Sequence, residues 1–130
     1  MALKWIRNQK GQALVESALV LPIILLLLLG MVELGRVSNA YLAVMHAARH
    51  GARYGAVGAT NDEIISRVLS SAAHLDSTNL TVLINPESGR QSGQDIKVTV
   101  TYPITMLTPL TGSIFTEPIT VRSDITMLVE

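Results

Sequence analysis

The longest apolar stretch lies near the start of the chain. Residues 13–32 read ALVESALVLPIILLLLLGMV and contain one charged side chain, Glu16. An α-helix rises about 1.5 Å per residue, so this stretch spans roughly 30 Å, the thickness of a bilayer core. We therefore predict a membrane-spanning helix over residues 12–32. The alternatives are a buried core helix or a cleaved secretory signal, whose candidate site at Ser38-Asn39-Ala40 lies several residues beyond the leucine run.

The helical pattern continues past the apolar stretch to about Gly55, without a proline. We expect its apolar stripe to pack on the rest of the chain, through Leu34, Val37, Tyr41, Val44, Met45 and Ala48. A ridge of small residues at i+4 spacing would let another backbone approach closely: Ala43, Ala47, Gly51 and Gly55. Four basic residues lie largely off the stripe: Arg36, Arg49, His50 and Arg53. Gly55 and Gly58 are typical of a helix end.

A second, shorter helix is predicted over about Asp62–His74. Thr60 is a plausible N-cap, and Asp62 and Glu63 place negative charge in the first helical turn. Apolar residues follow at helical spacing: Ile64, Ile65, Val68, Leu69, Ala72 and Leu75.

The last third of the chain alternates apolar and polar residues, which indicates half-buried strands. The apolar positions of the three strands are Leu80, Val82 and Ile84, then Ile96, Val98, Val100 and Tyr102, then Ile119, Val121, Ile125, Met127 and Val129. Pro86–Gly93 is a polar connector, and Pro103–Pro118 is predicted to be an apolar loop.

These elements predict an α+β fold. A sheet with one polar face, in about 75 residues after Gly55, has a marginal core of its own and needs a partner. We expect a long N-terminal helix, membrane-spanning in its first half and amphipathic in its second, packed on a small head. The head contains the short helix and a three-stranded antiparallel sheet.

Composition and charge exclude several classes of function. Hydrophobic residues make up 48% of the chain and charged residues 15%, which excludes intrinsic disorder. The formal net charge is zero, which argues against a nucleic-acid binder. The chain has no cysteine, so disulfides, thiol nucleophiles and cysteine-ligated metals are excluded.

The flanks of the apolar stretch predict its orientation. Lys4, Arg7 and Lys10 precede it without an acidic residue among them, and basic flanks stay on the cytoplasmic side. Trp5 fits the interfacial aromatic belt. We predict a cytoplasmic leader over residues 1–11, a transmembrane helix over 12–32 and an extracytoplasmic part over 33–130.

No catalytic constellation is found. His46 and His50 have a spacing that can place two imidazoles on one metal, but only His74 could join them, and a structural role is favoured. Asp62 and Glu63 are adjacent and diverge on a helix. Gly-x-Ser-x-Gly and glycine-rich phosphate motifs are absent. We expect no enzyme activity, no metal and no cofactor.

Two residues inside the apolar stretch are unusual. Glu16 is costly in a bilayer, so it either snorkels to the headgroups or pairs with a cation at the same depth. An α-amino group from another chain would serve, if a new N-terminus formed near residue 12. Pro22 removes the helical donor to the carbonyl of Ala18, so we predict that it bends or loosens the helix.

A basic leader that ends in glycine, followed by an apolar helix with a glutamate, resembles the cleavage site of type IV prepilins. In the segment Lys10-Gly11-Gln12-Ala13-Leu14-Val15-Glu16 that resemblance places cleavage after Gly11, so that Gln12 becomes the new N-terminus. It also implies that Glu16 pairs with a neighbouring subunit's N-terminal amine.

Further segments resemble the TadE-like family, pseudopilins of tight-adherence (Tad) pilus systems. They are Leu19-Val20-Leu21-Pro22, Val32-Glu33-Leu34-Gly35-Arg36, Ala47–Tyr54, the Val98–Pro103 strand and Leu107-Thr108-Pro109-Leu110. Ser17 stands where major pilins of this class carry tyrosine, which favours a minor pseudopilin. Family members often carry a cysteine pair in the head, and this chain has none.

The resemblance implies a type IV pilin-like fold and a minor pseudopilin of the inner membrane, acting in pilus assembly for adherence or secretion. The implied partners are a prepilin peptidase, a sister pseudopilin, the major pilin, the membrane assembly platform and lipid. One alternative is an unprocessed, signal-anchored protein with an extracytoplasmic adaptor head. Another is a secreted enzyme behind a cleaved signal, although it would lack a catalytic set.

Overall fold

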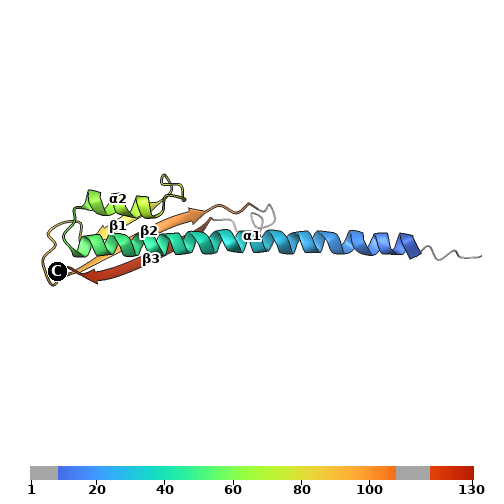
Figure 1. Ribbon diagram of the computed structural model, residues 1–130, viewed down its shortest axis with the longest axis horizontal. Coiled ribbons are helices and arrows are strands. Elements are labelled where there is room, and N and C mark those ends of the chain that lie inside the picture. The colour runs from blue at the N-terminus through green and yellow to red at the C-terminus, as the bar shows by residue number, and fades with distance from the viewer. Residues whose placement is uncertain (1–8, 108–117) are drawn as a thin grey trace, which may run out of the picture. The chain divides into compact units, whose positions relative to one another are not determined.

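The computed structural model describes residues 9–107 and 118–130, and it has the predicted α+β fold (Figure 1). In chain order its elements are the helices α1 (Gln9–Ala56) and α2 (Asn61–Ser71) and the strands β1 (Thr81–Asn85), β2 (Asp95–Ile104) and β3 (Ile119–Leu128). The chain divides into two compact units, Met1–Leu34 and Gly35–Glu130. The second unit is called the head below. Lys4, Trp5, Arg7 and most of the predicted Pro103–Pro118 loop lie outside the described residues.

The three strands form one antiparallel sheet with β2 in the centre. The register places Val98 of β2 between Ile84 of β1 and Ile125 of β3. These apolar residues share one face of the sheet, because directly opposed residues in antiparallel strands point to the same side. The predicted alternation therefore gives one apolar face and one largely polar face.

Strand β2 is longer than the sequence pattern indicates. It continues through Pro103 to Ile104, which we expected to lie in a loop. The pairing of β1 with β2 stops at Thr101, whereas Pro103 still lies opposite Thr120 of β3. Beyond Thr101, β2 thus has a neighbour on one side only among the described strands. Proline lacks an N–H group, and it is tolerated in a strand where one edge is free.

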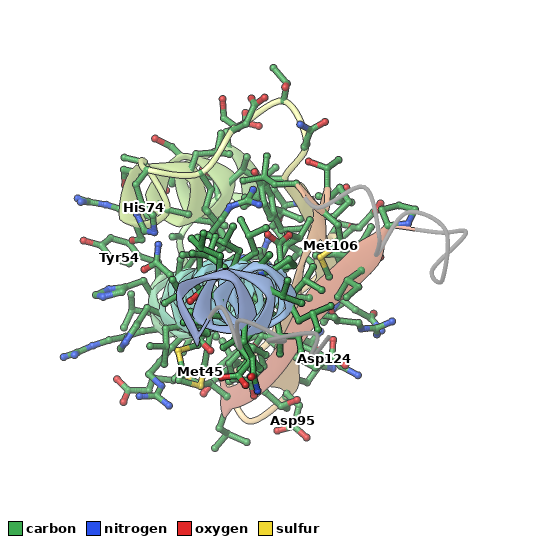
Figure 2. The ribbon with its side chains drawn as sticks, turned by 90° about the vertical axis from the view of Figure 1, so that its right-hand side faces the viewer. Met45, Tyr54, His74, Asp95, Met106 and Asp124 are labelled. Carbon is green, nitrogen blue, oxygen red and sulfur yellow. The ribbon has the colours of Figure 1, made fainter. Side chains whose placement is uncertain are left out.

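The apolar sheet face is covered by α2 and the head part of α1 (Figures 1 and 2). The fully buried side chains of the resulting core come from both helices and the sheet, and the largest are Val44, Ile64, Val68, Ile96, Val98 and Val100. Residues far apart in sequence thus share one core, which agrees with the expectation that the sheet needs a helix to cover it.

The face that α1 buries differs from the predicted stripe. Tyr41 is 49% exposed and Leu34 is 68% exposed, so the prediction was wrong for both residues. Val44 and Ala48 of the predicted stripe are buried as expected, and Val37 and Met45 are partly buried. The rest of the buried face consists of small residues outside that stripe: Ala40, Ala43, Ala47, Gly51, Ala52, Gly55 and Ala56. A Cβ atom added at Gly51 would lie 2.6 Å from Cγ2 of Val68, which leaves no room for a larger residue. The predicted small-residue ridge is therefore the surface of close approach.

Thr60 is the N-cap of helix α2, as predicted, and the helix begins at Asn61. The Glu63 N–H donates to Oγ1 of Thr60 at 3.4 Å, and the Thr60 N–H donates to Oε2 of Glu63 at 2.9 Å. This reciprocal capping box satisfies backbone donors that the first helical turn leaves unpaired. The helix ends at Ser71, a few residues before the expected end at His74.

Hydrogen bonds tie the end of α1 and the α1–α2 connection to other elements of the head. The Glu130 N–H donates to the carbonyl of Ala56 at 2.9 Å, and thereby satisfies one of the last carbonyls of α1. Arg90 donates from Nη1 to the carbonyl of Ala59 at 2.7 Å and from Nη2 to the side chain of Asn61. The β1–β2 connector is thus fixed to the α1–α2 connection.

The polar sheet face is organised around Asp124. Its Oδ1 atom accepts hydrogen bonds from Oγ1 of Thr99 at 2.6 Å and from Nε of Arg122 at 3.1 Å. Lys97 Nζ lies 3.9 Å from its Oδ2. The Thr99 hydrogen bond, followed by Arg122, holds the pKa of Asp124 below its ordinary value of 3.8. Thr99 is buried, although it lies on the face that the alternation assigns to solvent.

We expect Gly55→Ala to destabilise the head by about 1–3 kcal/mol, because the added methyl group would collide with the buried Ile96. Gly35→Ala is the matched control in the same helix. No side chain or other backbone lies within 4 Å of its added Cβ, so it should be neutral or stabilising by about 0.5–1 kcal/mol. Thermal unfolding of the full chain in detergent measures both variants. Equal stability of Gly55→Ala and the wild type would contradict the close approach.

The lowered pKa of Asp124 also predicts that the stability of the head depends on pH in the acidic range. A carboxyl group with a lower pKa in the folded state than in the unfolded state stabilises the fold above its unfolded pKa. That stability is lost as the pH falls through the folded value, so the head should weaken below about pH 4. Asp124→Asn should flatten the fall in melting temperature between neutral and acidic pH, whereas Asp95→Asn, at an exposed carboxylate of β2, should not. If the melting temperatures of the wild type and Asp124→Asn fell in parallel as the pH decreased, this account would be refuted.

Candidate functional site

The first part of α1 exposes apolar side chains in every direction. From Leu14 to Val32 its large apolar residues are 48–71% exposed. A helix that is apolar all round is stable only when lipid or other apolar helices surround it. Within the described residues, α1 is also the one helix whose length and composition would allow it to cross a membrane.

The predicted processing residues lie in the first turns of this helix. Gln12 and Glu16 are one helical turn apart, and Nε2 of Gln12 donates to Oε1 of Glu16 at 3.3 Å. The structure therefore brings together two of the predicted site residues, with Gly11 next to them in the chain. The donor in this contact is a neutral amide, so the contact does not neutralise the Glu16 carboxylate.

Pro22 lies inside α1, and the helix continues on both sides of it. The proline has no N–H group to donate to the carbonyl of Ala18, so one helical hydrogen bond is missing at this point. Whether the helix bends there in a membrane or an assembly stays a prediction.

The other candidate residues do not form a reactive centre. His46, His50 and His74 are all exposed. Across residues 9–107 and 118–130, no three histidine, aspartate or glutamate side chains are grouped closely enough to hold a metal ion. Glu63 caps α2, which explains its position without invoking catalysis. Its hydrogen bonds with the backbone and side chain of Thr60 lower the pKa of Glu63 below 4.5.

The head has an open groove between the end of α1 and α2. It has a volume of about 770 Å³ and is lined by residues that include Tyr54, Val57, Ser66 and Arg67. The Arg67 guanidinium lies over the Tyr54 ring, 4.6 Å from its centroid. Such a cation–π contact stabilises the packing of the two helices. Asp62, Glu63 and Ser70 line the same groove.

One group of exposed residues was noted in the sequence but given no role. Arg49 and Arg53 lie on the solvent side of α1, together with His46 and His50. The signal that could have drawn attention to them is the absence of acidic residues between residues 35 and 56.

Comparison with known proteins agrees with the motifs in α1. No curated protein and no solved structure matches the chain. A family model does match, over residues 11–53, and its description is TadE-like protein. The matched segment contains all four predicted site residues, Gly11, Gln12, Glu16 and Pro22. The resemblance of this chain to the TadE-like family is thereby confirmed over residues 11–53.

Proposed function

We propose that the chain is a minor pseudopilin that acts in the assembly of a Tad-type (Flp) type IV pilus involved in adherence or secretion. One observation carries the proposal: an apolar helix exposed on all sides, with Glu16 near its start, lies within the segment that matches the TadE-like family. Such a helix is suited to lateral packing, first among lipids and then among the helices of other subunits. The role is structural, with no reaction assigned to the chain.

In this proposal a prepilin peptidase cleaves between Gly11 and Gln12. Gly11 has no side chain to obstruct a protease at the membrane face. Cleavage would remove the basic leader and leave a free α-amino group on Gln12, with the membrane span still attached. The head would lie on the extracytoplasmic side of the inner membrane, since the basic leader stays in the cytoplasm.

The new amino group explains the presence of Glu16. The Gln12 side chain that contacts Glu16 within the chain is neutral, so a carboxylate in an apolar environment still needs a cation. The α-amino group of a neighbouring subunit supplies one at a similar depth. The pairing therefore joins different subunits, and the proposed partners are a sister pseudopilin, the major pilin and the assembly platform in the membrane.

Gly11→Leu should block processing, because its side chain would occupy the space next to the cleaved bond. Gly30→Leu is the matched control, since no neighbouring atom lies within 4 Å of a Cβ added at Gly30 in the same helix. Gel mobility and N-terminal sequencing of the membrane fraction would distinguish the products. We expect Met1 or Ala2 at the N-terminus of Gly11→Leu and Gln12 at the N-terminus of the control. Processing of Gly11→Leu at the wild-type rate would contradict the proposed site.

Glu16→Ala should leave expression and membrane insertion near wild type but abolish pilus-dependent adherence. The loss of one member of a buried ion pair strands the other, at a cost of about 3–5 kcal/mol. Ser17→Ala, at the next exposed position, is the control and should assemble normally. Glu16→Gln tests whether hydrogen bonding suffices in place of charge. Normal pili from Glu16→Ala cells would show that Glu16 snorkels to the headgroups and does not pair.

A further inference from the structure

The head part of α1 carries a line of basic side chains that the proposed function does not use. His46, Arg49, His50 and Arg53 follow one another at i, i+3, i+4 and i+7, which places them on one face of the helix. All four are exposed. We call this set the basic stripe. Figure 2 shows Tyr54, the next residue, pointing from α1 to the side opposite Asp124 and the sheet.

The basic stripe has no counter-charge within the part of the chain that the structure describes. None of its four side chains makes a hydrogen bond or an ion pair with another described residue. No acidic residue occurs between residues 35 and 56, so α1 itself supplies none in this region. Arg49 and Arg53 each present a guanidinium group with several N–H donors, and the imidazoles add further hydrogen-bonding nitrogen atoms.

Apolar side chains lie at both ends of the basic stripe. Leu42 precedes it and is 48% exposed, and Val57 follows it and is 66% exposed. Val57 also lines a hollow of about 450 Å³ with His50, Arg53 and Tyr54. A basic centre between two apolar contacts fits a protein helix, which can present carboxylates between apolar side chains. A lipid headgroup layer would satisfy the charges but not the apolar ends.

Distance along the helix also argues against lipid. Arg49 lies about 20 Å along α1 from Gly35, where the head begins. Attraction between exposed charges is largely screened beyond about 8–10 Å at physiological ionic strength. A bilayer surface at the start of the head would therefore act weakly on the basic stripe.

We infer that the basic stripe binds a helix of a different subunit, one that presents carboxylates at i and i+3 or i+4, and that it prevents two copies of this chain from packing through this face. Two copies packed face to face would bring four arginines together, and like charges across an interface cost several kcal/mol. The described helices of the chain offer no complement. In α1 the acids are Glu16 and Glu33, far apart, and in α2 they are Asp62 and Glu63, which are adjacent. The inference deepens the proposed function, because it states which chemistry a partner subunit must carry.

The experiment uses a charge-reversed copy of the full chain as the acidic probe. This copy carries Arg49→Glu and Arg53→Glu. Both it and the otherwise wild-type copy carry His46→Cys, the single cysteine in a chain that naturally has none. The two forms are tagged differently, mixed in non-ionic detergent at low salt, and treated with a short bifunctional thiol reagent. The transmembrane helices are identical in every combination, so any contact between them contributes equally.

We expect the mixed pair to cross-link at least about tenfold more than either like pair, with the difference disappearing at high salt. If the two wild-type copies cross-linked more than the mixed pair, the inference would be overturned, since this face would then join copies of the same chain. Equal cross-linking in all three combinations would also overturn it, because contact through this face would then not depend on the charges at positions 49 and 53.

A second arm separates this inference from the proposed function. In the native host, Arg49→Glu with Arg53→Glu should reduce pilus-dependent adherence at least about tenfold, because it reverses the face that the partner recognises. Gln91→Glu with Ser92→Glu adds negative charge at exposed positions of the β1–β2 connector and should leave adherence unchanged. If the detergent result holds but adherence is unaffected by Glu16→Ala and by the stripe variant alike, the pilus function fails and the acidic-helix recognition stands. If the stripe variant adhered normally while Glu16→Ala lost adherence, the inference would be overturned and the proposed pilus function would stand.

Discussion

The head depends on how closely α2 and the sheet can approach α1. A three-stranded sheet and an eleven-residue helix have too little apolar area to form a stable core alone, so they must close on the long helix. They can do so because α1 presents alanine and glycine on that side. At Gly51 and Gly55 a single methyl group would meet side chains of α2 and β2. Small residues, more than large ones, thus determine the packing of the head.

This constraint leaves the larger side chains of α1 free for other contacts. Tyr41 and Leu42 are about half exposed within the head, and the basic stripe lies on the solvent side of the same helix. In the first unit the apolar residues from Leu14 to Val32 are exposed as well. Each part of α1 therefore has a surface that the chain itself does not cover, one apolar and one basic. Both are suited to a protein that acts by packing against other molecules.

The sequence allowed much of this fold to be predicted, and the errors have physical causes. Strong alternation identified the strands, and Thr60 with Glu63 marked the start of α2 through chemistry that is local in sequence. The buried face of α1 was assigned wrongly at Leu34 and Tyr41, because hydrophobicity favours large residues whereas close packing requires small ones. Pro103 was assigned to a loop because sequence does not reveal where β1 ends beside β2. The site residues Gly11, Gln12 and Glu16 came from a motif, and the motif could not indicate that Arg49 and Arg53 lack a counter-charge.

The central claim is that the chain enters an assembly after the loss of its leader, with its membrane helix retained. The most direct test is the intact mass of the protein isolated from membranes and pili of its native host. The account predicts the mass of residues 12–130, with Gln12 at the N-terminus. The full mass of residues 1–130 would indicate an unprocessed anchored protein. The loss of about 35–40 residues would indicate a cleaved secretory signal, and either result would contradict the account.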